Sequence, residues 1–188
     1  MMKRLSLRFL ALGFALTTAR AARGQEEKPS PIVIGQMVDA VLRALVSPDS
    51  SLSRVPVSKR QIAFDKARTL ESFGYSRAEA SSDVDLRLRA TVVDGSRSML
   101  SDCKQSAPLP CAGLGWRAYV WVERISITAS EATLRVWVAW ADRGDTRFAQ
   151  DAPLGARAFL VGFGSTVHLE KDSAGTWRFS SVESTAVG

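Results

Sequence analysis

The spacing of apolar residues changes once along this chain, from a helical period to an alternating one, and this change limits the possible folds. Between Pro31 and Val46 apolar residues recur three and four positions apart, with Ser30 placed to act as the N-cap. This spacing predicts a helix with one apolar face. From Val84 onward apolar and polar residues alternate, which is typical of half-buried strands. Helices followed by strands are expected to form two packed layers.

The segment between these two regions has two interpretations. The leading one is a second helix from Arg60 to Phe73, ended by Gly74 in the left-handed conformation. The other is a short strand from Gln61 to Asp65 followed by a shorter helix. The apolar residues Ile62, Ala63, Ala67, Leu70 and Phe73 fall roughly on one face of that helix, and Ser76–Ser82 can add another helical turn.

Strands are predicted at Val84–Val92, Arg117–Thr128, Ala132–Ala141, Arg157–Lys171 and Thr176–Ser184. The last four follow one another through turns without a crossover helix, so they are expected to pair antiparallel. In the third of these strands one face carries only apolar side chains and is assigned to the core: Leu134, Val136, Val138 and Trp140. The predicted fold class is α+β, with N-terminal helices packed on a curved, mostly antiparallel sheet of four to five strands.

This order of elements resembles the NTF2-like superfamily, in which N-terminal helices cover a curved antiparallel sheet. The closing hairpin, Thr166–Lys171 followed by Gly175–Phe179, is similar to the ending common in that superfamily. The resemblance implies a pocket between the sheet and the helices. It leaves the activity open, because the superfamily includes enzymes, binding modules and proteins without a known ligand. The Asp–His acid/base pair of its enzymatic members has no counterpart that can be placed in this sequence.

The N-terminal residues have the three parts of a cleavable secretory signal. Lys3 and Arg4 form a basic end, residues 5–16 are mostly apolar, and Ala19-Arg20-Ala21 is a small-residue cleavage site. The apolar run is shorter than the roughly 20 residues that cross a bilayer. We therefore expect a secreted or periplasmic protein without a stable membrane span after cleavage. The expected organisation is a signal peptide (1–21), a flexible leader (22–30) and a single α+β domain (31–188).

The net charge depends strongly on this signal. The whole chain has a formal net charge of +6, and residues 1–21 contain four basic residues and no acid, so their removal leaves +2. A nearly balanced domain has no broad electrostatic attraction for phosphate backbones. We therefore expect no nucleic-acid partner, and the sequence does not indicate an oligomeric state.

The two cysteines, Cys103 and Cys111, are expected to form a disulfide, because an exported chain with an even cysteine count favours one. They lack the Cys-x-x-Cys spacing of redox pairs. His168 is the only histidine, and two thiols without further ligands do not make a zinc site. The sequence therefore predicts no metal and no cofactor.

Four side chains are the candidate binding residues: Tyr119, Trp121, Arg135 and Trp137. Aromatic residues on adjacent antiparallel strands can form one patch, either as core packing or as a surface that binds a ligand or partner. The leading hypothesis is an exported non-enzymatic domain that binds a small apolar ligand or a protein partner through a sheet face or pocket. The alternatives are an exported hydrolase or isomerase that uses a carboxylate in an NTF2-like pocket, and a structural, envelope-associated protein without a ligand.

No catalytic residue is assigned. The carboxylates that an acid/base reaction could use occur in no recognisable motif: Asp65, Asp83, Asp85, Glu123 and Asp142. His168 alternates with polar residues and is expected to face solvent, with Ser165 on the opposite strand face. Gly162 and Gly164 lie within a strand, where glycine is typical of a bend or close packing and less often of a pocket wall.

The exported protein should begin near Ala22 and contain no free thiol, because the small-residue site ends at Ala21 and the two cysteines are expected to pair. Intact-mass measurement should give the mature chain, lighter by two hydrogen atoms than after reduction. A mature chain that still begins at Met1 would exclude the signal, and two thiols labelled in the denatured, unreduced protein would exclude the disulfide.

Overall fold

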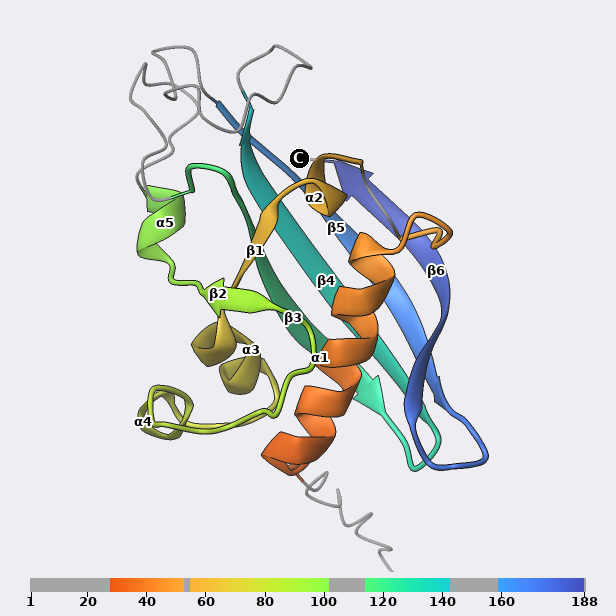
Figure 1. Cartoon of the computed structure of the whole chain (residues 1–188). Helices are drawn as coiled ribbons and strands as arrows, with labels where there is room; N and C mark the ends of the chain where they lie inside the picture. Colours follow the sequence, from red (N-terminus) through yellow and green to blue (C-terminus); the bar gives the residue numbers. More distant parts are fainter. Residues whose placement is uncertain (1–27, 53–54, 102–113, 143–158, 188) are drawn as a thin grey trace, which may run out of the picture.

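The computed structural model describes residues 28–52, 55–101, 114–142 and 159–187 (Figure 1). The expected signal peptide and the start of the leader lie outside the described residues, as do Cys103 and Cys111. Among the helices of the described residues, none is long and apolar enough to cross a membrane.

The N-terminal helix α1 spans Pro31–Val46, as the apolar spacing predicted. Ser30 is its N-cap and accepts a hydrogen bond from the Val33 amide at 3.4 Å, while Pro31 occupies the first turn. The helix lies across one face of a sheet (Figure 1).

That sheet has six strands in the order β2-β1-β3-β4-β5-β6. Their bounds in chain order are β1 Gln61–Phe64, β2 Val92–Asp94, β3 Arg117–Ile127, β4 Glu131–Asp142, β5 Phe159–Lys171 and β6 Trp177–Val187. The strands from β3 to β6 pair antiparallel, whereas β1 is parallel to both of its neighbours. The α+β class is confirmed. The predicted count of four to five strands is too low, because the short strands β1 and β2 extend the sheet beyond β3.

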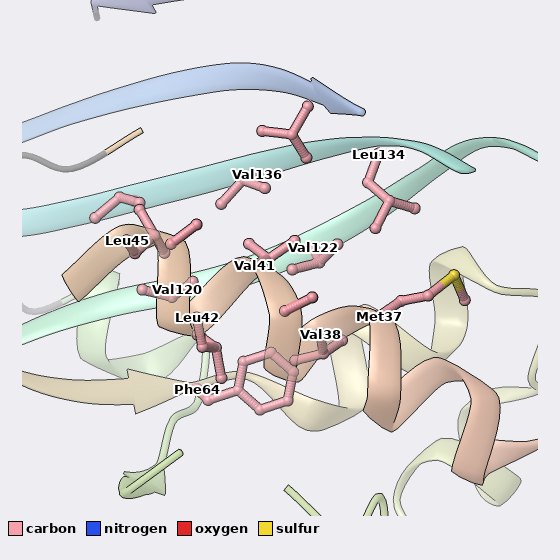
Figure 2. Packing of buried hydrophobic residues seen from close by; sticks show 14 of the residues in the cluster. Met37, Val38, Val41, Leu42, Leu45, Phe64, Val120, Val122, Leu134 and Val136 are labelled. Atoms are coloured by element: carbon pink, nitrogen blue, oxygen red, sulfur yellow. The ribbon is translucent and has the colours of Figure 1, made fainter. Parts of the chain in front are cut away.

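The core is formed by the face of the sheet that α1 covers (Figure 2). The four apolar residues of β4 that the alternation assigned to the core are buried there, from Leu134 at 0 % exposed to Trp140 at 7 %. The helix contributes side chains that are fully buried: Ile34, Met37, Val38, Val41, Leu42 and Leu45. In the described part of the chain these side chains fill the space between α1 and the middle of the sheet, where the NTF2-like resemblance implied a pocket.

The helix predicted over Arg60–Phe73 is wrong, and the competing interpretation, a short strand followed by a shorter helix, is confirmed. Strand β1 is followed directly by α3, Lys66–Ser72, with Asp65 as N-cap. The Asp65 carboxylate accepts the Arg68 amide at 2.8 Å. Gly74, just after the helix, has the left-handed φ of 90° that glycine tolerates. Three further short helices are α2 Val55–Ser58, α4 Arg77–Ala80 and α5 Ser98–Ser101.

The strand predicted at Val84–Val92 is wrong. Only Val92–Asp94 pairs as a strand, and residues 83–91 run as an irregular segment against α1. The buried Asp39 carboxylate on α1 accepts the amides of Arg89 and Ala90 at 2.9 and 2.8 Å, so a helix side chain takes the place of a neighbouring strand. Arg87 has a φ of 51°, which interrupts the extended backbone. The alternation therefore indicated which side chains face inward, but not strand pairing.

The last residues of the expected leader make specific contacts. The Tyr75 hydroxyl donates to the Pro29 carbonyl at 2.9 Å, and the Lys28 ammonium lies 3.7 Å from the centre of the Tyr75 ring. Lys28 also pairs with Glu79 at 2.9 Å. Hydrogen bonds from Lys28 and from the Ser76 amide lower the pKa of the Glu79 carboxyl to about 2. These contacts hold the residues just before α1 against the segment around α4.

Gly35→Ala should destabilise the fold, although the same change stabilises most helices by about 1 kcal/mol. A Cβ atom on Gly35 would lie 1.7 Å from the Leu86 carbonyl oxygen, where residues 83–91 cross the helix. The chain would have to move, and we expect a loss of about 1–3 kcal/mol in urea unfolding. Gln36→Ala, on the exposed side of the same helix turn, is the control and should stay within about 0.5 kcal/mol of the wild type. An unfolding midpoint for Gly35→Ala at or above the wild-type value would contradict the close crossing.

Candidate binding face of the sheet

The sheet face opposite α1, called the outer face here, carries all four candidate binding residues. Tyr119 and Trp121 alternate along β3 with buried core residues, and Arg135 and Trp137 do the same along β4. The register places Trp121 directly opposite Trp137, and Glu123 opposite Arg135. The period-two assignment of the β4 faces is therefore correct, and the candidate residues lie side by side.

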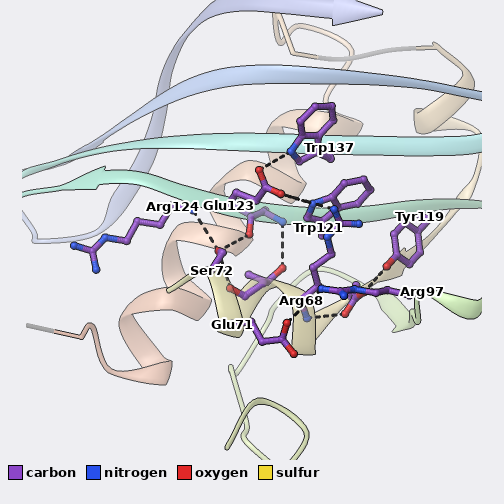
Figure 3. A network of polar contacts seen from close by, with 12 residues as sticks. Arg68, Glu71, Ser72, Arg97, Tyr119, Trp121, Glu123, Arg124 and Trp137 are labelled. Carbon is purple, nitrogen blue, oxygen red and sulfur yellow. Dashed lines mark hydrogen bonds and ion pairs between the residues drawn. The ribbon is translucent and has the colours of Figure 1, made fainter. Parts of the chain in front are cut away.

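The two tryptophans form a stacked pair that a carboxylate holds in place (Figure 3). Their ring centroids are 5.6 Å apart and the ring planes differ by 11°. Glu123 accepts the indole N–H of Trp121 at 3.0 Å through Oε1 and that of Trp137 at 2.8 Å through Oε2. One carboxylate thus fixes the orientation of both rings, and hydrogen bonds to a charged acceptor are the stronger kind.

Helix α3 is attached to the edge of β3 by side-chain hydroxyls. Strand β1 pairs with β3 only as far as Val120, and α3 then lies beside the remaining edge. The Val122 amide donates to the Thr69 hydroxyl at 3.1 Å, and the Ser72 hydroxyl shares its hydrogen between the Thr69 carbonyl at 2.8 Å and the Val122 carbonyl at 3.1 Å. The Arg124 amide donates to the same Ser72 oxygen at 3.3 Å. These bonds satisfy backbone groups that would otherwise lack a strand partner, and they set the position of α3.

That position brings Arg68 of α3 over the outer face. Its guanidinium carbon lies 3.6 Å from the centre of the Trp121 ring, which makes a cation–π contact. Its Nη2 is also 3.9 Å from Glu123 Oε1. Arg68, Trp121 and Trp137 therefore form one row of stacked groups across α3, β3 and β4 (Figure 3).

Beneath Arg68, a buried tyrosine joins β3 to the start of α3. The Tyr119 hydroxyl donates to the Asp65 carboxylate, whose other oxygen caps α3. The Tyr119 ring lies 5.4 Å from that of Trp121. Burial and the hydrogen bond to Asp65 raise the pKa of the Tyr119 hydroxyl well above its ordinary value, so it stays protonated at neutral pH.

A glycine of β5 makes room for the outermost ring. Gly164 is opposite Trp137 in the sheet, and a Cβ atom on it would lie 2.7 Å from the Trp137 ring. At Gly162 a Cβ atom would lie 2.9 Å from the Val138 carbonyl oxygen. Close packing therefore explains both glycines, as the sequence predicted.

The four candidate residues differ in how far they reach the surface. Tyr119 is fully buried, and Trp121 is 7 % exposed. Trp137 is half-buried and Arg135 is exposed, with its guanidinium carbon 5.9 Å from the Trp137 ring centre. A binding partner would thus meet Trp137 and Arg135, while Trp121 and Tyr119 support them from below.

The carboxylates do not form an acid/base pair in the described part of the outer face. Asp65 and Glu123 both lie near it, but helix capping, the Tyr119 hydroxyl and the two indoles occupy their oxygens. Asp83 and Asp85 are exposed on the segment that crosses α1. The side chain of Asp142 lies outside the described residues.

His168 projects from the polar side of β5, as predicted, while Ser165 is buried on the other face. The imidazole is more covered than expected, with 37 % of the side chain exposed. Its Nδ1 lies 3.3 Å from the Thr133 hydroxyl and its Nε2 lies 3.4 Å from Glu183. Among the described residues, no cluster of three or more His, Cys, Asp or Glu side chains is placed to hold a metal ion.

Sequence reasoning missed the contribution of Arg68 and the role of Glu123. Arg68 is distant in sequence from β3 and reaches Trp121 only because α3 packs on the β3 edge. Glu123 had a detectable signal, since it follows Trp121 by two positions and so shares its strand face. The register that brings Trp137 to the same carboxylate is visible only in the folded sheet.

Comparisons with protein-family models, with curated proteins and with solved structures found no match. The resemblance to the NTF2-like superfamily therefore rests on element order and the closing hairpin alone.

Substitution of the two neighbouring tryptophans of β4 should separate the fold from the outer face. Trp140 packs in the core with its ring centroid 6.0 Å from that of Phe163, so Trp140→Ala should cost about 3–5 kcal/mol of unfolding free energy. Trp137→Ala loses one stacking contact and one hydrogen bond and should cost about 1–2 kcal/mol. Equal unfolding midpoints for the two variants in urea would contradict this assignment of faces.

Proposed function

We propose that this protein is an exported, non-enzymatic domain that binds a protein partner on the outer face, around Trp137 and Arg135. The observation that carries the proposal is the stacked pair of tryptophans whose N–H groups share Glu123. Tryptophan and arginine are the residue types that contribute most to protein interfaces. A ring already held in one orientation loses little conformational freedom when a partner binds, which favours affinity.

A protein partner is favoured over a small apolar ligand because of where apolar side chains lie. The region between α1 and the sheet, where an apolar ligand would be enclosed, is filled by core side chains (Figure 2). The outer face instead offers the half-buried Trp137 and the exposed Arg135, and a surface that mixes an aromatic ring with a guanidinium suits a protein interface better than an enclosed ligand site.

A hydrolase or isomerase is disfavoured because the carboxylates near the outer face, Asp65 and Glu123, already make hydrogen bonds within the protein. General acid/base catalysis needs a titratable group within reach of a substrate proton. Asp65 and Glu123 instead make hydrogen bonds to groups of the protein itself.

A purely structural role for the outer face is the remaining alternative, in which the stacked tryptophans only stabilise the sheet. The proposal that the protein is exported rests on the signal-like residues 1–21, and an exported protein would meet its partner outside the cytoplasm.

A photo-crosslinking amino acid introduced at Arg135 should join the exported protein to its partner in cells that make it. The matched position is Ser173, which is exposed in the β5–β6 turn and lies away from the stack. We expect a specific adduct from position 135 and none from position 173. The adduct should disappear when Trp137→Ala is added, although the protein remains folded by circular dichroism.

Adducts of equal strength from both positions would contradict the proposal. An adduct from position 135 that persists in the Trp137→Ala background would also contradict it, because Trp137 would then be unnecessary for recognition.

A further inference from the structure

A small cleft beside the outer face is lined by three arginines from separate elements. Arg68 comes from α3, Arg77 from α4 and Arg97 from the segment after β2. The cleft has a volume of about 260 Å³, and Ser81 and Ser96 add hydroxyl groups to its lining.

Two acids, Asp65 and Glu71, also line this cleft, and a third, Glu123, contacts Arg68 from outside it. The Asp65 oxygens are directed to the Arg68 amide and to the Tyr119 hydroxyl. Glu71 pairs with Arg97 at 3.3 Å. With Glu123, three carboxylates are matched against the three guanidinium groups, and among the described residues the charge that no acid pairs with is that of Arg77.

Arg77 provides the unpaired charge. Its side chain is exposed at the start of α4, and in the described part of the chain no acid pairs with it. Arg97 is paired on one side only and is 67 % exposed, so it keeps donors for a ligand. Arg68, the third arginine of the lining, is held by Trp121 and Glu123.

We propose that this cleft binds an oxyanion, either a phosphate or a carboxylate group. Guanidinium groups present planar forks of N–H donors that match the oxygen pairs of these groups. Donors from three separate elements can surround one tetrahedral or planar anion, and the serine hydroxyls can donate to its remaining oxygens. The cleft does not include Trp137 or Arg135, so the inference does not depend on the proposed function.

The test is a titration of the folded protein with inorganic phosphate at constant ionic strength, followed by amide NMR signals. Saturable shifts are expected for Ala67, Ser81 and Ser96, which line the cleft. Arg77→Gln and Arg97→Gln should each raise the dissociation constant for phosphate by about tenfold or more, because each loses one charge-assisted hydrogen bond to the anion. A parallel titration with acetate distinguishes a phosphate site from a carboxylate site, because the anion with the lower dissociation constant identifies the group that the cleft prefers.

Arg89→Gln is the matched control, since it removes the same charge from an exposed side chain that does not line the cleft. It should leave the dissociation constant unchanged, as should Trp137→Ala. The proposal is overturned if the NMR shifts grow with phosphate concentration without saturation, because that result would indicate non-specific contact with a surface anion. It is equally overturned if Arg77→Gln and Arg97→Gln bind both anions as tightly as Arg89→Gln does.

Discussion

The attachment of both sides of β3 is the constraint on which the rest of the structure depends. On one side β3 pairs with β4 along its length, and on the other β1 covers only its first residues. The Thr69 and Ser72 hydroxyls of α3 complete that second edge by bonding the backbone of Val122 and Arg124. Unpaired backbone groups are costly when they are removed from water, so this bonding determines where α3 can lie. The position of α3 in turn brings Arg68 onto Trp121.

The two faces of β3 then serve different purposes. Val120 and Val122 pack under α1, and Tyr119, Trp121 and Glu123 form the base of the outer face. The polar groups on that face satisfy one another, since Glu123 accepts two indole N–H groups and Asp65 accepts the Tyr119 hydroxyl. Such a network resists rearrangement, because the loss of one partner leaves another group unsatisfied. Rigidity of this kind suits a preorganised surface, whether it binds a partner or only stabilises the sheet.

The strands show which features of the fold the sequence pattern predicts and which it does not. The alternation along β4 assigned Leu134, Val136, Val138 and Trp140 to the core, and the structure places them there. The same reasoning failed at Val84–Val92, since Asp39 of α1 accepts amides that a strand would otherwise share. Periodicity reports which side chains face the core. It does not report what the backbone amides bond to, because that partner is distant along the chain.

The sequence by itself determined the α1 helix, the order of the antiparallel strands and the face of β4 that enters the core. Each of these follows from the local period of apolar residues and from capping and turn residues close in sequence. Only the tertiary structure decided the parallel pairing of β1, the crossing of residues 83–91 at Gly35 and the sharing of Glu123 by Trp121 and Trp137. It also brought Arg68, Arg77 and Arg97 to one cleft. These features depend on register and on contacts between segments far apart in the chain, and no local pattern of residue types carries that information.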